Sequence, residues 1–469
     1  MNELDHEAPI NIVPLKRVLG LSTSILLVAG IMIGSGVFKK IAPMAASGLS
    51  VNYLITAWIV AGLITLCGAL VVAGLANLTE ESGGIYEYIR ISYGRFLSFL
   101  YGWTAFTIIG SASVAALAFI FAQSVNALIP LSQPFSHLDS FSIAGFIYPA
   151  QNSGVKLLAI TAIILLTIIN YRGVKHGANL NAFLTWGKML GILFIIIAGL
   201  SITGESAEPD VERANSPLTN VSVYTAFFGA MLSAFWAYDG WADVSFVTGE
   251  IKNPKRNVPI AIISGVFIVM LLYVMVNAAY MKTLPLAELA GLSENDIAAA
   301  AVAESILGNP GRVFVLILIM ISTFGSVNVI IFAYPRVYMR MAQQQSFFRS
   351  MAVVHPKFRT PSVGLIAAML WSIVLVITGT FDMLTDLIIF SGFFFYIVIA
   401  AALIKMKRNR SITARVPGYP LVPIIIIIFA LALLINTIIL QPKETLFGLI
   451  LMFGGVPLYF YFRTAKKKS

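Results

Sequence analysis

Long runs of apolar residues, separated by short polar stretches, follow one another along almost the whole chain. A helix needs about 20 predominantly apolar residues to cross the hydrocarbon core of a membrane. Most of the runs reach that length, and their spacing leaves only short loops between them. The pattern therefore predicts twelve membrane-spanning helices, at 18–38, 52–77, 96–129, 154–171, 178–203, 220–247, 258–283, 312–342, 361–380, 383–405, 421–440 and 445–462.

Composition agrees with this pattern. The 469 residues are 58% hydrophobic and 11% charged, with a mean hydropathy of +0.89, whereas soluble domains carry about 25% charged residues. The first apolar run leads on without a small-residue cleavage site, so it does not resemble a signal peptide. We therefore expect an all-α integral membrane protein whose surroundings are the lipid bilayer.

Basic residues are distributed unevenly between the predicted loops. If the N-terminus is cytoplasmic, most of the 31 lysines and arginines fall in cytoplasmic segments, as the positive-inside rule requires. The tails 1–17 and 463–469 are then both cytoplasmic. This topology accounts for the net charge of +10, so we expect no nucleic-acid partner.

The chain has one cysteine, Cys67, inside the second predicted span. We expect it to be a small buried apolar residue. No outer-loop cysteine is left for a disulfide bond to a partner chain.

The first span contains three glycines within seven residues, in the sequence GIMIGSGVF from Gly30 to Phe38. Glycine in a helix interior costs roughly 1 kcal/mol relative to alanine. Close packing of membrane helices also uses glycine, but three glycines so near one another indicate a helix that breaks in mid-membrane.

The sixth span has a matching interruption, in FWAYDGWAD from Phe235 to Asp243. Interrupted spans at corresponding positions of two halves are typical of transporters with inverted repeats, whose substrate binds at the breaks. We predict a first repeat at 18–203, a second at 220–405 and two peripheral helices at 421–462.

Unwound backbone in hydrocarbon needs hydrogen-bond partners. An amino acid supplies them: its carboxylate can accept from the N–H groups of Ser35, Gly36 and Val37 at a positive dipole end. Its ammonium can donate to carbonyl groups near Met32 and Ala237.

Three motifs resemble a known family. These are GSGVF in span one, FWAYDGWADVSFVTGEIKNPKRNVPIA from Phe235 to Ala261, and FGSVN from Phe324 to Asn328 followed by HPKFRTP. They are similar to the amino acid–polyamine–organocation superfamily, and within it to the L-type amino acid transporters and their bacterial relatives. The resemblance implies a leucine-transporter-like fold with two inverted five-helix repeats, helices 1–5 and 6–10, plus two peripheral helices, working by alternating access.

The resemblance also implies roles for individual residues. Met32, Ser35, Gly36 and Val37 would contact the substrate backbone, and Ala237 and Asp239 would offer carbonyl groups to its amine. Trp236 takes the place of an aromatic gate that covers the substrate from outside. Tyr396 falls where related transporters often have an aromatic facing the site, a weaker assignment.

Lys188 stands in mid-span, where a charged residue is costly enough to indicate a function. In the family, a lysine at this place resembles a permanent substitute for the sodium ion of related symporters, bridging span one near Gly30 and span eight near Ser326. Transport would then not need sodium. A titrating lysine that carries a proton is an alternative that the sequence leaves open.

Several charged residues depart from the L-type pattern. Asp239 and Asp243 add negative charge near the predicted site, or pair with Lys188, or cap the half-helix. Lys39 and Lys40 would line the outer vestibule. Four scattered histidines and no paired acids, metal cluster or nucleophile–base set argue against an enzyme.

We therefore predict a sodium-independent carrier of neutral L-amino acids, working at least partly as an exchanger, in a bacterial inner membrane. The alternative is a proton-coupled or antiporting carrier of cationic amino acids or polyamines, and a second alternative is a non-transporting amino acid sensor. No cofactor, metal or disulfide-linked heavy chain is expected.

Overall fold

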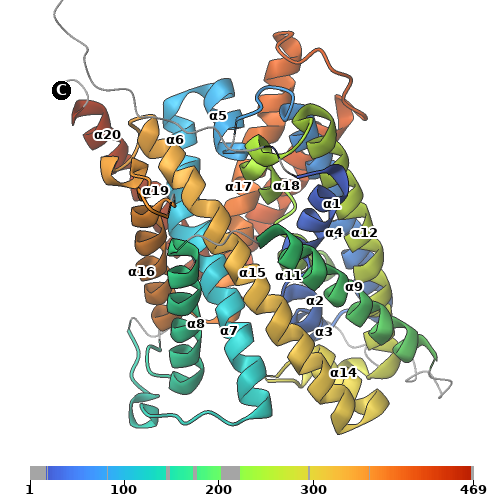
Figure 1. The fold of residues 1–469 in the computed structure, drawn as a ribbon. Helices are drawn as coiled ribbons and strands as arrows, with labels where there is room; N and C mark the ends of the chain where they lie inside the picture. The colour runs from blue at the N-terminus through green and yellow to red at the C-terminus, as the bar shows by residue number, and fades with distance from the viewer. Residues whose placement is uncertain are drawn as a thin grey trace, which may run out of the picture.

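The computed structural model describes residues 17, 19–81, 83–143, 148–172, 177–201, 222–293, 296–358 and 360–465. Within these residues, eight helices are long and apolar enough to cross a membrane. The other four predicted spans correspond to α9, α16 and two interrupted segments. The predicted all-α architecture is confirmed (Figure 1).

The first half of the chain contains the elements that correspond to predicted spans one to five. They are α1 (Leu21–Met32), α2 (Gly36–Lys39), α3 (Ile41–Ala45), α4 (Val51–Leu75), α5 (Ile85–Tyr93), α6 (Arg95–Thr104), the π-helix η1 (Ala105–Ile109), α7 (Gly110–Leu128), the 3₁₀-helix η2 (Ser136–Leu138), α8 (Ser153–Tyr171) and α9 (Gly177–Ser201).

The second half contains the remaining spans. Its elements are α11 (Val223–Tyr238), the 3₁₀-helix η3 (Asp243–Glu250), α12 (Pro254–Thr283), α13 (Leu286–Ala290), α14 (Ala298–Leu307), α15 (Asn309–Gln343), the 3₁₀-helix η4 (Arg349–Ala352), α16 (Ser362–Thr378), α17 (Phe381–Arg408), α18 (Leu421–Leu440), α19 (Pro442–Phe453) and α20 (Gly455–Ala465).

Helix packing follows the two-fold relation of an inverted repeat. In an inverted repeat, span one is equivalent to span six and span two to span seven. A contact between two spans of different halves is then expected to be repeated by the two equivalent spans. Thus α1 packs on α12 and α11 packs on α4, while α7 packs on α16 and α15 packs on α8. The equivalent central helices, α4 with α12 and α7 with α15, pack on each other.

Both predicted breaks are present. Helix α1 ends at Met32, and Ile33 has non-helical torsion angles (φ −75°, ψ 79°). Helix α11 ends at Tyr238, Asp239 is extended, and Gly240 has φ +91°, a conformation that disfavours any side chain. A Cβ at Gly240 would also lie 2.5 Å from Cγ2 of Ile31. The second break therefore depends on glycine at this position.

The apolar pattern missed some details of the elements. It predicted α-helix over 220–247, but residues after the break form the 3₁₀-helix η3. It gave no helix between 284 and 311, where α13 and α14 are too short to be recognised as spans. The predicted tail 1–17, apart from Arg17, and residues 466–469 of the last tail lie outside the described residues.

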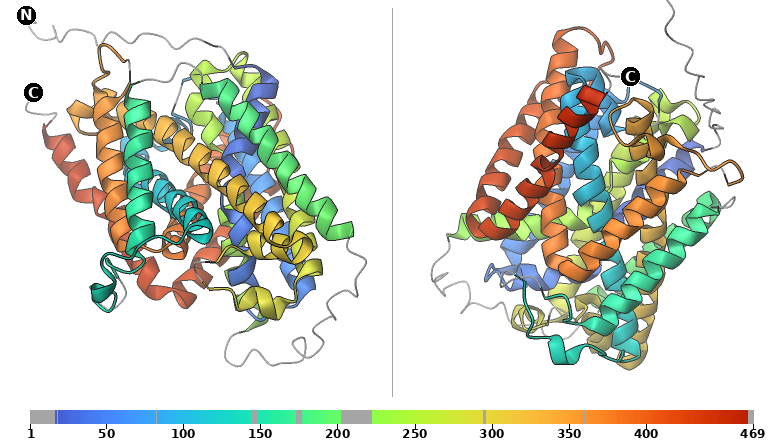
Figure 2. Two further views of the ribbon diagram at one scale, coloured as in Figure 1. Left: turned by 60° about the horizontal axis from the view of Figure 1, so that its bottom comes forward. Right: turned by 90° about the vertical axis from the view of Figure 1, so that its left-hand side faces the viewer.

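The two ends of the helix bundle differ. Figure 1 shows α5 and the C terminus at one end, called the α5 end below, and α3 and α14 at the opposite end, called the α14 end. Figure 2 shows α20 at the outer edge of the bundle, consistent with a peripheral position. Both breaks lie between the two ends, because each separates the two parts of an interrupted span.

Candidate functional site

The two broken spans touch each other at their breaks. A Cβ built at Gly36 would lie 2.4 Å from Cα of Ala237 and 2.8 Å from its backbone nitrogen. No side chain fits in so small a space, so Gly36 is required for this approach of α2 to α11. A ligand between the breaks must separate these two residues.

Hydrogen-bond donors are unused on the span-one side of this contact. The backbone N–H groups of Ser35, Gly36 and Val37 donate to no group among the described residues. The first residue of this segment whose N–H forms a helical hydrogen bond is Phe38, which donates to the Ser35 carbonyl. Unpaired N–H groups in mid-membrane are costly. They can bind an anion such as a carboxylate.

Hydrogen-bond acceptors are unused on the span-six side. The carbonyl groups of Ala237 and Tyr238 accept no hydrogen bond within the described part of the chain. The carbonyl group of Met32, which the sequence also suggested for the substrate amine, is occupied in this conformation. It accepts from the Tyr273 hydroxyl at 2.8 Å and from the Gly34 N–H at 2.8 Å.

Lys188 joins spans one and eight. Its ammonium group donates to the carbonyl oxygens of Gly30 and Ile33, both at 3.2 Å, and to the Ser326 hydroxyl at 3.1 Å. The side chain is 2% exposed. The structure thus brings together the three residues that the resemblance grouped, and adds Ile33, whose carbonyl also accepts from Ser322 at 3.2 Å.

Trp236 covers the breaks on the side of the α14 end. Its indole N–H donates to the Ser35 hydroxyl at 3.2 Å, and its ring packs against Phe381 of α17 with the ring centres 6.1 Å apart. Only 7% of Trp236 is exposed. Two aromatic rings thus pack together beside the breaks.

Lys39 and Lys40 lie beside this aromatic pair. In this conformation they do not line an open outer vestibule, because they are 4% and 1% exposed. Lys40 donates to Asp382 at 2.5 Å and to Thr385 at 2.8 Å, while Lys39 donates to Gln123 at 2.7 Å. These partners, together with the Phe381 ring beneath both ammonium groups, make burial possible.

The α5 end is closed mainly by ion pairs. Arg340 binds Glu87 at 2.8 Å and Glu81 at 3.4 Å, and Arg336 binds Glu250 at 3.6 Å. The backbones of Leu19 and Ile251 form an isolated parallel bridge, which connects the start of span one to the end of η3.

Arg17 connects the start of the described chain to this same end. It binds Glu80 at 2.5 Å, and this hydrogen bond lowers the pKa of the Glu80 carboxyl group. Lys255 at the start of α12 lies 3.7 Å from the same carboxylate. Span one is thus held to the loop after α4 as well as to η3.

A cavity lies on the α5 side of the second break. Asp239 and Asp243 both line it, together with Tyr101, Tyr334 and Tyr396. Lys188 donates to spans one and eight instead of to these acids, and Asp243 makes no capping hydrogen bond at the start of η3. Two of the alternatives for Asp243, pairing with Lys188 and capping, are therefore not seen.

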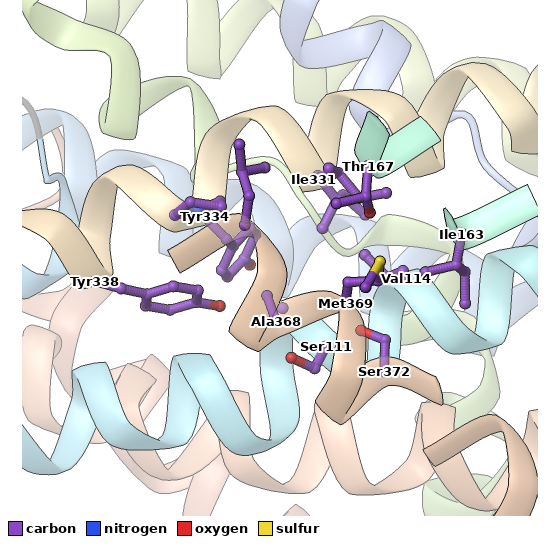
Figure 3. A pocket seen from close by; sticks show the side chains of 14 residues that line it. Ser111, Val114, Ile163, Thr167, Ile331, Tyr334, Tyr338, Ala368, Met369 and Ser372 are labelled. Carbon is purple, nitrogen blue, oxygen red and sulfur yellow. The ribbon is translucent and has the colours of Figure 1, made fainter. Parts of the chain in front are cut away.

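A second cavity lies between α7, α8, α15 and α16 (Figure 3). The hydroxyl-bearing residues Ser111, Thr167 and Ser372 line it beside Met369. Tyr334 lines both cavities and forms a common wall between them.

The sequence agrees with known proteins over nearly its whole length. A family model described as "Amino acid permease" matches residues 19–456. This chain belongs to the amino acid permease family. The match covers both breaks and Lys188, and it ends at the start of α20.

Curated relatives of this permease are transporters and not enzymes. It is 29% identical over 457 residues to the serine/threonine exchanger SteT of Bacillus subtilis, covering 96% of this chain and 98% of the relative. It is 30% identical to the large neutral amino acids transporter small subunit 2 of rabbit (Oryctolagus cuniculus), covering 96% and 81%. It is 28% identical to the b(0,+)-type amino acid transporter 1 of mouse (Mus musculus), covering 97% and 90%.

Sequence reasoning missed several partners in the site. Tyr273, Ser322 and Phe381 are distant in the chain from the residues they contact, and none carries a charge or belongs to a glycine motif. The interrupted spans identified the breaks, but only the packing of α12, α15 and α17 could identify what surrounds them.

Proposed function

We propose that this permease exchanges L-amino acids across a bacterial inner membrane by alternating access, without sodium. One observation carries the proposal. The first break has unused N–H groups, the second has unused carbonyl groups, and the two breaks touch at the Gly36–Ala237 contact. An α-amino acid is a zwitterion whose carboxylate can accept from the N–H groups and whose ammonium can donate to the carbonyl groups. Both groups are attached to the same carbon atom, so they lie close enough together to reach the two touching breaks.

Independence from sodium is supported by Lys188. Its ammonium group is held by two carbonyl oxygens and one hydroxyl oxygen at 3.1–3.2 Å. Oxygen atoms of this kind would otherwise be available to a small cation. A covalently attached ammonium that links α1 to α15 supplies the positive charge in every state of the cycle.

Exchange is supported by the name of the Bacillus relative, a serine/threonine exchanger. The distribution of basic residues in the sequence places the α5 end and both termini in the cytoplasm. Because the single cysteine, Cys67, lies within α4, we propose that the permease works without a disulfide-linked heavy chain.

The breaks alone do not select a side chain. Neutral substrates were the first prediction from the sequence, and cationic substrates were the alternative. Both carry the same backbone groups, so the choice depends on the space beyond Asp239.

Proteoliposomes preloaded with a mixture of unlabelled L-amino acids would test the proposal. We expect external radiolabelled amino acids to be taken up faster into preloaded than into empty vesicles, equally in sodium and in choline chloride. Binding without uptake would favour a sensor, and uptake that requires sodium would contradict the role proposed for Lys188. Chemically altered product inside the vesicles would indicate an enzyme.

A further inference from the structure

The cavity beyond Asp239 has an unbalanced charge. Its lining comes from α5, α6, η1, the second break, α15 and α17, and it includes two carboxylates, Asp239 and Asp243. No lysine, arginine or histidine is among the described residues that line it. Carboxylates inside a membrane protein are expensive unless a positive charge or a proton compensates them.

Neither carboxylate has a close side-chain donor, although the backbone N–H of Gly240 also stabilises the Asp239 carboxylate. The Tyr396 hydroxyl lies 3.5 Å from Oδ1 of Asp239, and the Tyr334 hydroxyl lies 3.4 Å from Oδ1 of Asp243. These distances are at the outer limit of hydrogen bonding, whereas bonds to ionised groups are usually shorter than 3 Å. Neither acid forms an ion pair with any described residue.

A third polar group in the cavity is also unused. Tyr101 of α6 lines the cavity and is 3% exposed. Its hydroxyl makes no hydrogen bond with any part of the chain that the structure describes. A buried hydroxyl is rarely left without a partner, and this one belongs to a different helix from the two acids.

The cavity adjoins the proposed backbone site. Asp239 is the residue at which α11 ends, next to the free carbonyl groups of Ala237 and Tyr238, and its side chain lines the cavity. An amino acid held by its backbone at the breaks therefore has this space available for its side chain.

We propose that the cavity binds the positively charged end of a diamino acid, such as L-lysine or L-ornithine. An ammonium group has three N–H donors and no acceptor, and Asp239, Asp243 and Tyr101 offer three acceptors from separate places in the cavity wall. Asp243 is the residue that determines this specificity, because Asp239 also belongs to the backbone site. The inference rests on the proposed function and adds the substrate class.

Competition in proteoliposomes tests the inference. L-Norleucine has the carbon skeleton of L-lysine without its terminal ammonium group, so the two compounds isolate the charge. We expect L-lysine to compete with a radiolabelled substrate at least tenfold better than L-norleucine. This factor corresponds to about 1.4 kcal/mol, which is within reach of one hydrogen bond to a charged group.

Two variants locate the effect. Asp243→Asn should reduce the ratio of lysine affinity to norleucine affinity at least tenfold, and Tyr101→Phe, which removes only the hydroxyl, should reduce it by a smaller factor. Asp139→Asn, in an exposed loop, is the matched control and should leave the ratio unchanged. A single symmetric peak in size-exclusion chromatography of the purified protein shows that each variant is folded.

Other outcomes would overturn the inference. If wild-type protein exchanges neutral amino acids but ignores L-lysine, the proposed function stands and the cationic subsite fails. If no amino acid is exchanged, the proposed function fails first. If Asp243→Asn slows transport of both compounds equally and leaves their ratio unchanged, the carboxylate carries a proton in place of a substrate charge.

Discussion

A single buried lysine organises the first break. Lys188 contacts two carbonyl oxygens, one in α1 and one at Ile33 just after it, and one hydroxyl of α15, so it connects span one to α15. Removing the ammonium leaves the carbonyl groups of Gly30 and Ile33 with fewer donors in a region without water.

We therefore expect Lys188→Ala to reduce exchange roughly tenfold or more, because a buried unsatisfied group costs about 1–3 kcal/mol. The measurement is initial uptake per reconstituted protein. Lys282→Ala, at a lysine that donates one bond to the Leu200 carbonyl near the α14 end, serves as the control. Wild-type uptake in Lys188→Ala would make the lysine a bystander and remove the reason for sodium independence.

Gly36 illustrates two requirements at one residue. Its backbone N–H is one of the unused donors, and its missing side chain permits contact with Ala237. In the sequence, this glycine could be explained either by close helix packing or by substrate binding. The structure shows the close packing, and the unused N–H group of Gly36 remains free to bind a substrate.

Gly36→Ala should reduce substrate binding by about tenfold or more, because the new methyl group would occupy space between the breaks that the ligand needs, and overpacking costs roughly 1–3 kcal/mol. Gly187→Ala is the matched control, since a Cβ there meets nothing within 4 Å. Binding is measured by scintillation proximity in detergent. Equal affinities for both variants and wild type would exclude Gly36 from the site.

At the scale of elements, α17 closes the α14 end against span one. Phe381 packs on Trp236, while Asp382 and Thr385 hold Lys40. All three α17 residues lie in the first two turns of that helix, so one displacement of its start would release both the aromatic and the ionic contacts.

Asp382→Asn should weaken this closure, because it leaves the buried Lys40 ammonium without its carboxylate. We expect the half-saturation concentration for external substrate to change at least about threefold, given that an uncompensated buried charge costs 1 kcal/mol or more. Glu304→Gln removes an exposed ion pair with Arg312 and should have little effect. Identical kinetics in wild type, Asp382→Asn and Glu304→Gln would exclude a closing role for the Lys40–Asp382 ion pair.

The elements also show what a sequence can and cannot predict. Hydropathy located the spans, and clustered glycines located both breaks, because each signal is local. The pairing of Lys40 with Asp382 joins residues 342 positions apart, and the burial of both lysines follows from that pairing. The π-helix η1 also depends on distant residues, because the Tyr338 hydroxyl donates to the Ala105 carbonyl and the Trp371 indole donates to the Thr107 carbonyl.

At the scale of the whole molecule, orientation in the membrane is the simplest prediction to test. The loop that contains Asp139 and the connection that contains Ser411 lie outside the membrane-spanning helices and are exposed. Our topology places the first outside the cell and the second in the cytoplasm.

In a Cys67→Ala background, an impermeant maleimide should label Asp139→Cys in intact cells and Ser411→Cys only after permeabilisation. The replaced cysteine lies within α4 and has no charge, so its loss should be tolerated. The reverse labelling pattern would invert the topology and place the ion pairs of the α5 end outside the cell.

The unpaired backbone groups at the breaks also set the energetics of the empty carrier. When no substrate is bound, reorientation must carry unsatisfied N–H and C=O groups through a rearrangement in which water cannot solvate them. A bound zwitterion satisfies them and lowers that barrier. We therefore expect the loaded carrier to reorient faster than the empty one, and countertransport to exceed net efflux from the same vesicles. Under the proposed function, coupling between inward and outward fluxes would then arise from backbone hydrogen bonds that only a bound substrate completes.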